Sequence, residues 1–187
     1  MEIEYQIIKT NRKTLSVQIT KDCKILVRAP KNSSETYVKE FLKSKRNWIL
    51  KNFDKIQTQN QKAQKDGILS FEELNLLKKK AKKIIPQRVE YYAKISGIDY
   101  KKIIIRCQNT RWGSCSSKGN LNFNCLLVLM PQEILDSVVI HELCHRRYMN
   151  HSKEFYAEID KYFSNYKLCD KWLKENGLSY LKRLPQK

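Results

Sequence analysis

The sequence predicts an α+β protein in which a small β-rich N-terminal module precedes a larger domain of helices with a few strands. Short runs rich in Ile, Val and Leu occupy the first thirty residues, which is typical of strands. Segments with apolar residues at helical spacing dominate the rest of the chain. The 187 residues, 41% hydrophobic, suffice for one domain with a small appendage. We expect the boundary to divide residues 1–66 from 67–187.

The N-terminal module is predicted to contain strands and one helix. The predicted strands cover residues 3–9, 14–20 and 24–29. Lys21-Asp22 indicates a hairpin between the second and third strands, and Pro30 ends the third. One amphipathic helix is predicted from about residue 34 to 53. The polar stretch 54–67 has almost no apolar residue, so we interpret it as a linker or loop.

The larger domain is predicted to begin with a long helix. Ser70 and Glu73 form a capping box that opens this helix, Pro86 should kink or restart it, and it should stop at Gly97. A strand at 102–106 and two extended segments around a turn at 116–120 follow. The remaining elements are predicted to be a helix opened by Pro131, a helix over about 152–166, and a short helix near Trp172 that frays.

All three histidines of the chain lie between positions 141 and 151, and two of them belong to an HExxH motif. Residues four apart on a helix lie on the same face, so His141 and His145 can bind one metal ion. An accidental HExxH on a polar helix surface is the alternative. The third histidine, His151, makes that alternative weaker, and the sequence therefore predicts a zinc site.

His151 can reach the same ion only if the helix ends before it. A straight helix would rotate His151 by about 600° from His145 and carry it about 9 Å along the axis. We therefore expect a break between Tyr148 and His151, with Asn150 in the left-handed conformation that asparagine tolerates. Glu154 and Glu158 remain alternative third ligands, as in zinc peptidases that use glutamate.

Glu142 lies between the two ligands of the motif and is the candidate general base. Its expected role is to take a proton from the water that zinc activates and to pass it to the leaving amine. A structural salt bridge with Arg146 is the alternative. A structural zinc site normally has four protein ligands, often cysteines, and the nearby Cys144 points away from both histidines. An open catalytic site is therefore favoured, and the presence of Glu142 argues against a catalytically silent adaptor.

The combined motifs resemble those of a known family. The segments 111–120 (RWGSCSSKGN), 122–124 (NFN) and 141–155 (HELCHRRYMNHSKEF) are similar to the YgjP-like family of zinc-dependent metallopeptidases, which is distantly related to the SprT-like proteases. The resemblance implies a zincin-like fold, with the HExxH helix packed on a small mixed sheet. It also implies a Zn2+ ion held by His141, His145 and His151, with Glu142 catalytic in peptide-bond hydrolysis.

The segment before the helix supplies candidate substrate-binding residues. In zincin folds a sheet edge beside the active-site helix pairs with extended substrate. The two extended segments around Gly119 are the candidates for that edge, so Trp112, Gly113 and Asn122 are predicted to contact substrate. Trp112 would wall the cleft and Gly113 would permit a close backbone approach. Trp112 as an ordinary core residue is the alternative.

The net charge, the apolar runs and the cysteine spacing indicate which partners, location and cysteine oxidation state to expect. A net charge of +18 attracts polyanions, so we expect weak, non-specific attraction to nucleic acid, and a DNA-associated, SprT-like protease is the alternative function. No apolar run is long enough to span a membrane, and the N-terminus lacks the features of a signal peptide, so we expect a cytoplasmic protein. The six cysteines include no CxxC pair and are expected to be reduced.

Overall fold

The computed structural model of the protein describes residues 4–185. The chain divides into two compact units, Met1–Lys65 and Asp66–Lys187, each with its own hydrophobic core.

The N-terminal unit contains a three-stranded sheet. Its strands are β1 (Gln6–Thr10), β2 (Ser16–Ile19) and β3 (Ile25–Pro30), in the order β1-β3-β2. The predicted hairpin is confirmed, because β2 pairs antiparallel with β3, whereas β1 runs parallel to β3. The third strand ends at Pro30 as predicted, and the predicted start of the first strand at Ile3 lies outside the described residues.

Two helices, α1 (Glu35–Ser44) and α2 (Arg46–Asp66), follow the sheet where one was predicted. The hydrogen bonds continue across the break, since the amide of Ile49 donates to the carbonyl of Lys45 at 2.9 Å. The prediction of a loop at 54–67 is wrong, because α2 extends to Asp66. This stretch is rich in Gln and Lys, which are good helix formers, and it contains no proline and no glycine before Gly67.

The C-terminal unit begins with α3 (Phe71–Ser96), whose capping box between Ser70 and Glu73 is present as predicted. Pro86 does not restart the helix, which is continuous to its cap at Gly97. The strands of this unit are β4 (Lys102–Arg106), β5 (Gly113–Cys115) and β6 (Asn120–Asn124). Their order is β4-β6-β5, with β6 parallel to β4 and antiparallel to β5, so the sheet is small and mixed.

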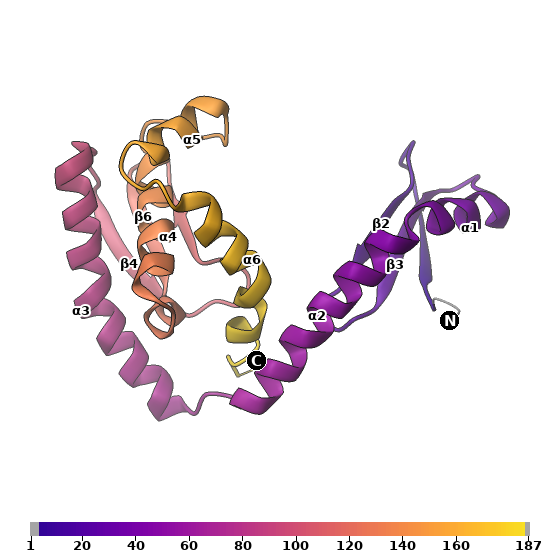
Figure 1. Ribbon diagram of the computed structural model, residues 1–187, viewed down its shortest axis with the longest axis horizontal. Coiled ribbons are helices and arrows are strands. Elements are labelled where there is room, and N and C mark those ends of the chain that lie inside the picture. The colour runs from indigo at the N-terminus through magenta and orange to yellow at the C-terminus, as the bar shows by residue number, and fades with distance from the viewer. Residues whose placement is uncertain (1–3, 186–187) are drawn as a thin grey trace. The chain divides into compact units, whose positions relative to one another are not determined.

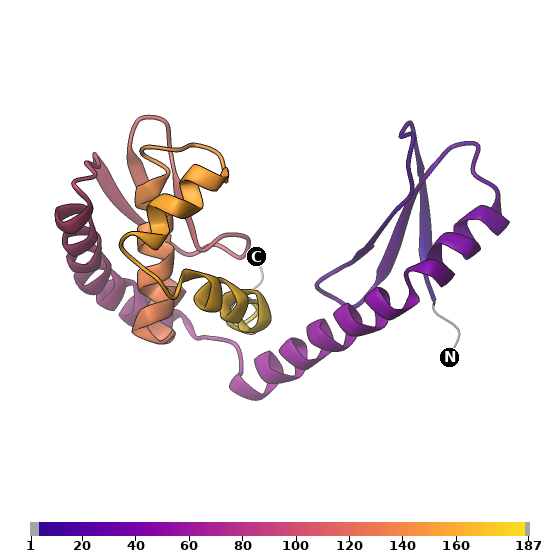
Figure 2. The same cartoon turned by 45° about the horizontal axis from the view of Figure 1, so that its top comes forward.

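A short 3-10 helix, η1 (Cys125–Leu129), leads into α4 (Gln132–Cys144), and α5 (Lys153–Asp160) and α6 (Tyr166–Leu181) complete the unit. The central helix, α4, lies between α3 and α6 and also contacts α5, β5 and η1 (Figures 1 and 2). It is therefore buried over most of its length, from Ile134 to Ile140 and again from Glu142 to Cys144. An α+β fold with the HExxH helix packed against a small mixed sheet agrees with the prediction.

The last two helices differ from their predicted extents. The helix expected over 152–166 ends at Asp160, and the short helix expected near Trp172 is longer than predicted, because it forms the sixteen-residue α6. Residues 161–165 separate the two helices. Ser164 and Asn165 are among them, and both residue types favour helix ends over helix interiors because their side chains compete for backbone groups. Buried residues of α6, among them Tyr166 and Cys169, hold it on the core.

The expectation that all cysteines are reduced is wrong for one pair. Cys107 and Cys125 form a disulfide, with their Cα atoms 5.7 Å apart. The two positions are 18 residues apart in sequence, and the parallel pairing of β4 with β6, in which Arg106 lies opposite Asn124, brings the residues that follow these strands together. Cysteine spacing alone does not reveal this. Among the described residues, no helix is long and apolar enough to cross a membrane.

Candidate metal centre

Two of the three histidines are placed by the end of α4. His141 lies in its last turn, and His145 is its C-cap. The helix ends at Cys144, earlier than the predicted break between Tyr148 and His151, and Asn150 does not adopt the predicted left-handed conformation. A tight turn, in which the amide of Tyr148 donates to the carbonyl of Cys144 at 3.0 Å, redirects the chain instead.

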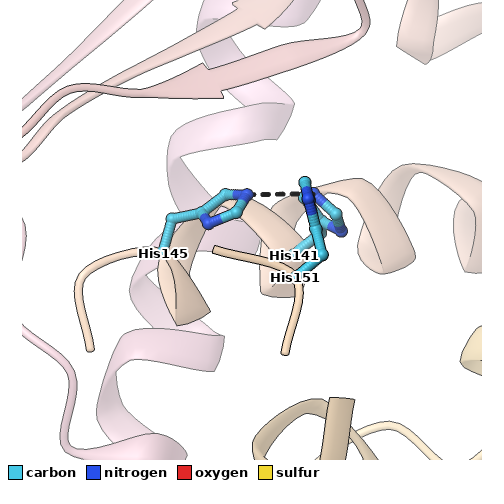
Figure 3. Close-up of side chains that lie close together, drawn as sticks. All are labelled: His141, His145 and His151. Carbon is cyan, nitrogen blue, oxygen red and sulfur yellow. Dashed lines mark hydrogen bonds between the residues drawn. The ribbon is translucent and has the colours of Figure 1, made fainter. Parts of the chain in front are cut away.

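His151 reaches the same point from the loop between α4 and α5. Ser152 then caps α5, its hydroxyl accepting a hydrogen bond from the amide of Phe155 at 3.4 Å. The chain therefore returns His151 to the other two histidines, so that the three side chains lie close together (Figure 3).

The three imidazoles converge through their Nε2 atoms. Nε2 of His141 lies 3.2 Å from Nε2 of His145 and 3.1 Å from Nε2 of His151. Three nitrogens bound tetrahedrally to one zinc ion at about 2.05 Å would be about 3.3 Å apart. Both printed distances are close to this value, and the candidate ligand atoms of all three histidines lie within 4.8 Å of one another, so the donor set fits a zinc ion with a fourth position open.

The opposite ring nitrogens of two histidines have partners that fix the rings. Nδ1 of His145 lies 3.0 Å from the carbonyl oxygen of Tyr148, and Nδ1 of His141 lies 2.7 Å from the hydroxyl of Tyr166. A proton on each Nδ1 leaves the Nε2 lone pair free for a metal, the arrangement typical of histidine ligands. Tyr166 was not predicted from the sequence, because nothing in its local pattern connects it to a residue 25 positions away.

A buried phenylalanine supports all three rings. The centre of the Phe155 ring lies 5.0 Å from that of His141, 4.6 Å from that of His145 and 4.9 Å from that of His151. Phe155 is fully buried, and its ring packs against all three histidine rings and restricts their positions.

The electrostatics of the site favour neutral imidazoles. Burial, followed by the proximity of His145 and His151, lowers the pKa of His141 to about 3. Burial also lowers the pKa of His145, with His151 adding to the effect, although the hydrogen bond to Tyr148 opposes it. A histidine must be neutral to bind a metal through nitrogen, so the apolar surroundings prepare these two residues for that role.

Glu142 is 5% exposed, and its carboxylate packs against Gly113 of β5. A Cβ atom on residue 113 would lie 2.5 Å from Oε1 of Glu142, so only glycine permits this approach. Burial raises the pKa of Glu142 to about 8, although Arg111 opposes the shift. The alternative salt bridge with Arg146 is not formed, because Arg146 donates to the carbonyl of Asp99 at 3.2 Å.

The two glutamates considered as third ligands lie apart from the histidines. Glu158 is buried and pairs with Arg147 and with Lys161, the latter at 2.7 Å. Burial acts to raise the pKa of Glu158, but the hydrogen bonds from Lys161 and Arg147 outweigh it and lower the pKa overall. Glu154 is exposed in the first turn of α5. The group that could hold a metal therefore consists of the three histidines.

A cavity of about 260 Å³ opens beside His141 and Glu142, and Trp112 and Gly113 line it. Asn122, the third residue predicted to contact substrate, does not line this cavity. It lies on the central strand β6, and its side chain is engaged with Arg106 at 3.0 Å and Ser114 at 3.2 Å. The strands β4 and β5 form the two edges of the sheet, and β5 contacts α4.

Comparison with known proteins gives one family and a few structures. The profile of the family described as YgjP-like, metallopeptidase domain, matches residues 13–76 and 71–176. The crystal structure of the metallopeptidase zymogen of Pyrococcus abyssi abylysin is 22% identical, with a TM-score of 0.44, over 49% of this chain and 93% of that one. The metallopeptidase zymogen of Methanocaldococcus jannaschii jannalysin is 27% identical, with a TM-score of 0.43 and the same coverages. No curated protein matches the chain.

Proposed function

The chain belongs to the YgjP-like metallopeptidase family, and we propose that it hydrolyses peptide bonds with a Zn2+ ion held by His141, His145 and His151 and with Glu142 as general base. One observation carries the proposal, namely the convergence of the three Nε2 atoms beside a cavity that Glu142 also lines. Membership of the family implies a metal ion and a peptide or protein substrate. The identity of the metal as zinc is proposed from the all-histidine donor set.

A zinc ion at this position supplies a Lewis acid and lowers the pKa of a water to about 7. The proton transfers of the reaction are assigned to Glu142. Glu142 accepts a proton from the attacking water and delivers it to the leaving nitrogen. Burial alone keeps its carboxyl protonated at neutral pH, but a divalent cation nearby favours the ionised form that a base requires.

The sheet edge is proposed to hold the substrate main chain. An extended peptide can add through backbone hydrogen bonds to β5, the edge strand that contacts the HExxH helix α4. Gly113 begins β5 and touches Glu142, so a peptide bound there would lie next to the general base. Trp112 and Gly113 remain proposed substrate-binding residues, and Asn122 is left out because its side chain is engaged within the sheet.

The proposal is tested by the substitution Glu142→Gln in zinc-loaded protein. Gln keeps the size of the side chain but cannot accept a proton, so hydrolysis of a fluorogenic peptide library should fall at least about a hundredfold. Zinc content and thermal stability should persist, because burial already disfavours the charged form of this residue. The matched control, Glu154→Gln on the exposed surface of α5, should cleave like wild type. Equal cleavage by Glu142→Gln would refute the assigned mechanism.

Two further predictions stay proposals. The exposed face of α3 carries Lys79, Lys80, Lys82 and Lys83, which supports weak electrostatic attraction to nucleic acid. No described feature favours DNA-associated proteolysis over hydrolysis of other proteins, so it remains the secondary candidate.

A cytoplasmic location also stays a prediction, and the Cys107–Cys125 disulfide weighs against it because disulfides are rare in the cytosol.

A further inference from the structure

The cavity beside His141 and Glu142 has walls that take no part in metal binding or proton transfer. Besides the two catalytic-site residues, α4 contributes Val138, α6 contributes Leu173, and the segment before β5 contributes Trp112. We propose that this cavity is the pocket for a substrate side chain next to the scissile bond, and that it selects a large apolar residue. The inference rests on the proposed function and names the substrate class of the same site.

The walls and size of the cavity suit an apolar side chain. Val138 precedes His141 by three residues, so the two lie on the same face of α4 and a side chain against Val138 is one helical turn from the metal site. Trp112 and Leu173 contribute apolar surface from the other elements. The volume of about 260 Å³ exceeds the roughly 150 Å³ that accommodates a benzene ring in a dry protein cavity. A phenylalanine or leucine side chain therefore fits.

Most polar groups on the lining already have partners. The hydroxyl of Ser137 donates to the carbonyl of Ile134 at 2.8 Å, and Tyr166 is bonded to His141. Asp170 pairs with Lys174 at 2.5 Å. An apolar side chain can therefore enter without leaving these groups unsatisfied, a cost that would oppose binding. Arg111 is the lining residue that would favour an acidic side chain instead, so charge selection is the rival outcome.

Trp112 forms a firm wall because a helix backbone supports it. A Cβ atom on residue 177 would lie 3.1 Å from Nε1 of Trp112, so the indole rests directly on α6 at Gly177. The other end of Trp112 is also held, since its carbonyl accepts a hydrogen bond from the amide of Asn124 at 2.8 Å. Glycine inside a helix is unfavourable relative to alanine, and the close approach of Trp112 accounts for it here.

The experiment separates binding from hydrolysis. Zinc-loaded Glu142→Gln is titrated with the N-acetyl amides of Phe, Leu, Ala and Asp, and bound fractions are followed by calorimetry. Wild type is given peptides that vary at the residues flanking one cleavable bond. The Phe probe should bind at least about tenfold more tightly than the Ala probe, and cleavage should show the same preference. Leu173→Ala in the same protein should reduce the preference several-fold.

The matched control is Leu168→Ala, the same change on α6 at a side chain that is 69% exposed and does not line the cavity. It should leave the preference unchanged. A second variant, Gly177→Ala, moves the Trp112 wall without removing an apolar lining residue, and it should also lower the preference for Phe.

Equal binding of the Phe and Ala probes would overturn the inference. So would tightest binding of the Asp probe that is lost in Arg111→Gln, because the cavity would then select charge. Selective binding of Phe by a protein that hydrolyses nothing would leave the pocket standing and refute the proposed function. Hydrolysis with no preference at either flanking residue would refute the pocket and leave the proposed function standing.

Discussion

The phenol oxygen of Tyr166 lies 2.7 Å from Nδ1 of His141, although the two residues are 25 positions apart and belong to different helices. This contact makes α6 part of the candidate metal centre. When Nε2 of His141 binds a metal, Nδ1 carries the ring proton and donates a hydrogen bond to the hydroxyl oxygen of Tyr166. Burial raises the pKa of Tyr166, so the hydroxyl stays neutral and available for this bond.

Tyr166→Phe should weaken zinc binding without unfolding the protein. Loss of such a partner typically lowers metal affinity by about 10- to 100-fold. The substitution keeps the aromatic ring that packs in the core, so the fold should persist. Competition with a chelator measures the affinity. Tyr156→Phe is the matched control, because its ring lies near His151 but the residue is 39% exposed. Equal zinc affinity in both variants would remove Tyr166 from the metal centre.

His151→Ala should lose more zinc affinity than Tyr166→Phe, because it removes a proposed ligand and not a supporting bond. Zinc content after dialysis against a weak chelator gives the comparison. Glu154→Ala, three residues further along and exposed, should retain wild-type zinc content. The opposite result, with zinc lost from Glu154→Ala and kept in His151→Ala, would assign the third ligand to a carboxylate.

Glu158→Gln should lower stability at neutral pH and leave zinc content unchanged. Glu158 faces Arg147, Lys161 and Tyr162, and hydrogen bonds of a charged group contribute about 1.5–3 kcal/mol. Because folding lowers the pKa of Glu158, its contribution is present above the ordinary value of 4.5 and is lost as the pH falls through the folded value.

Urea unfolding of metal-free protein at a series of pH values measures this contribution. The difference in unfolding free energy between wild type and Glu158→Gln should shrink as the solution is acidified below pH 4.5. Glu90→Gln, an exposed change on α3, supplies the control. A difference that stays constant down to low pH would mean that the charge of Glu158 does not stabilise the fold.

DNA binding by this protein should be weak, salt-sensitive and indifferent to sequence. The net charge of +18 is dispersed, and phosphate contacts release counterions, so affinity should fall steeply between low and moderate salt. Reversing Lys78, Lys79 and Lys82 to Glu should weaken binding and leave zinc content unchanged. Titrations by fluorescence anisotropy with two unrelated duplexes provide the measurement. Tight binding at high salt, or preference for one duplex, would favour the DNA-associated protease instead.

Local patterns allowed much of the fold to be predicted. The capping box at Ser70, the end of α3 at Gly97 and the β2–β3 hairpin depend on residues a few positions apart, and all three are present. The failures have local causes as well. The polar stretch after residue 54 was interpreted as a loop because it lacks apolar periodicity, but its high helix propensity and the burial of Gln59 and Ala63 keep it helical.

The sequence by itself determined the residues that can form the metal centre. Two histidines four apart on a helix share a face by geometry, and a chain with three histidines offers His151 and no other as a third imidazole. The same pattern placed Glu142 beside them. These conclusions need only helical periodicity and ligand chemistry, which act over a few residues.

The tertiary structure decided everything that depends on contacts between distant segments. It brought Tyr166 to His141, Phe155 beneath the three rings, and Gly113 against Glu142. It also made β5 an edge strand and β6, with Asn122, the central one. Packing selects such neighbours through shape and burial over the whole core, and no short-range pattern in the chain encodes which side chains will meet there.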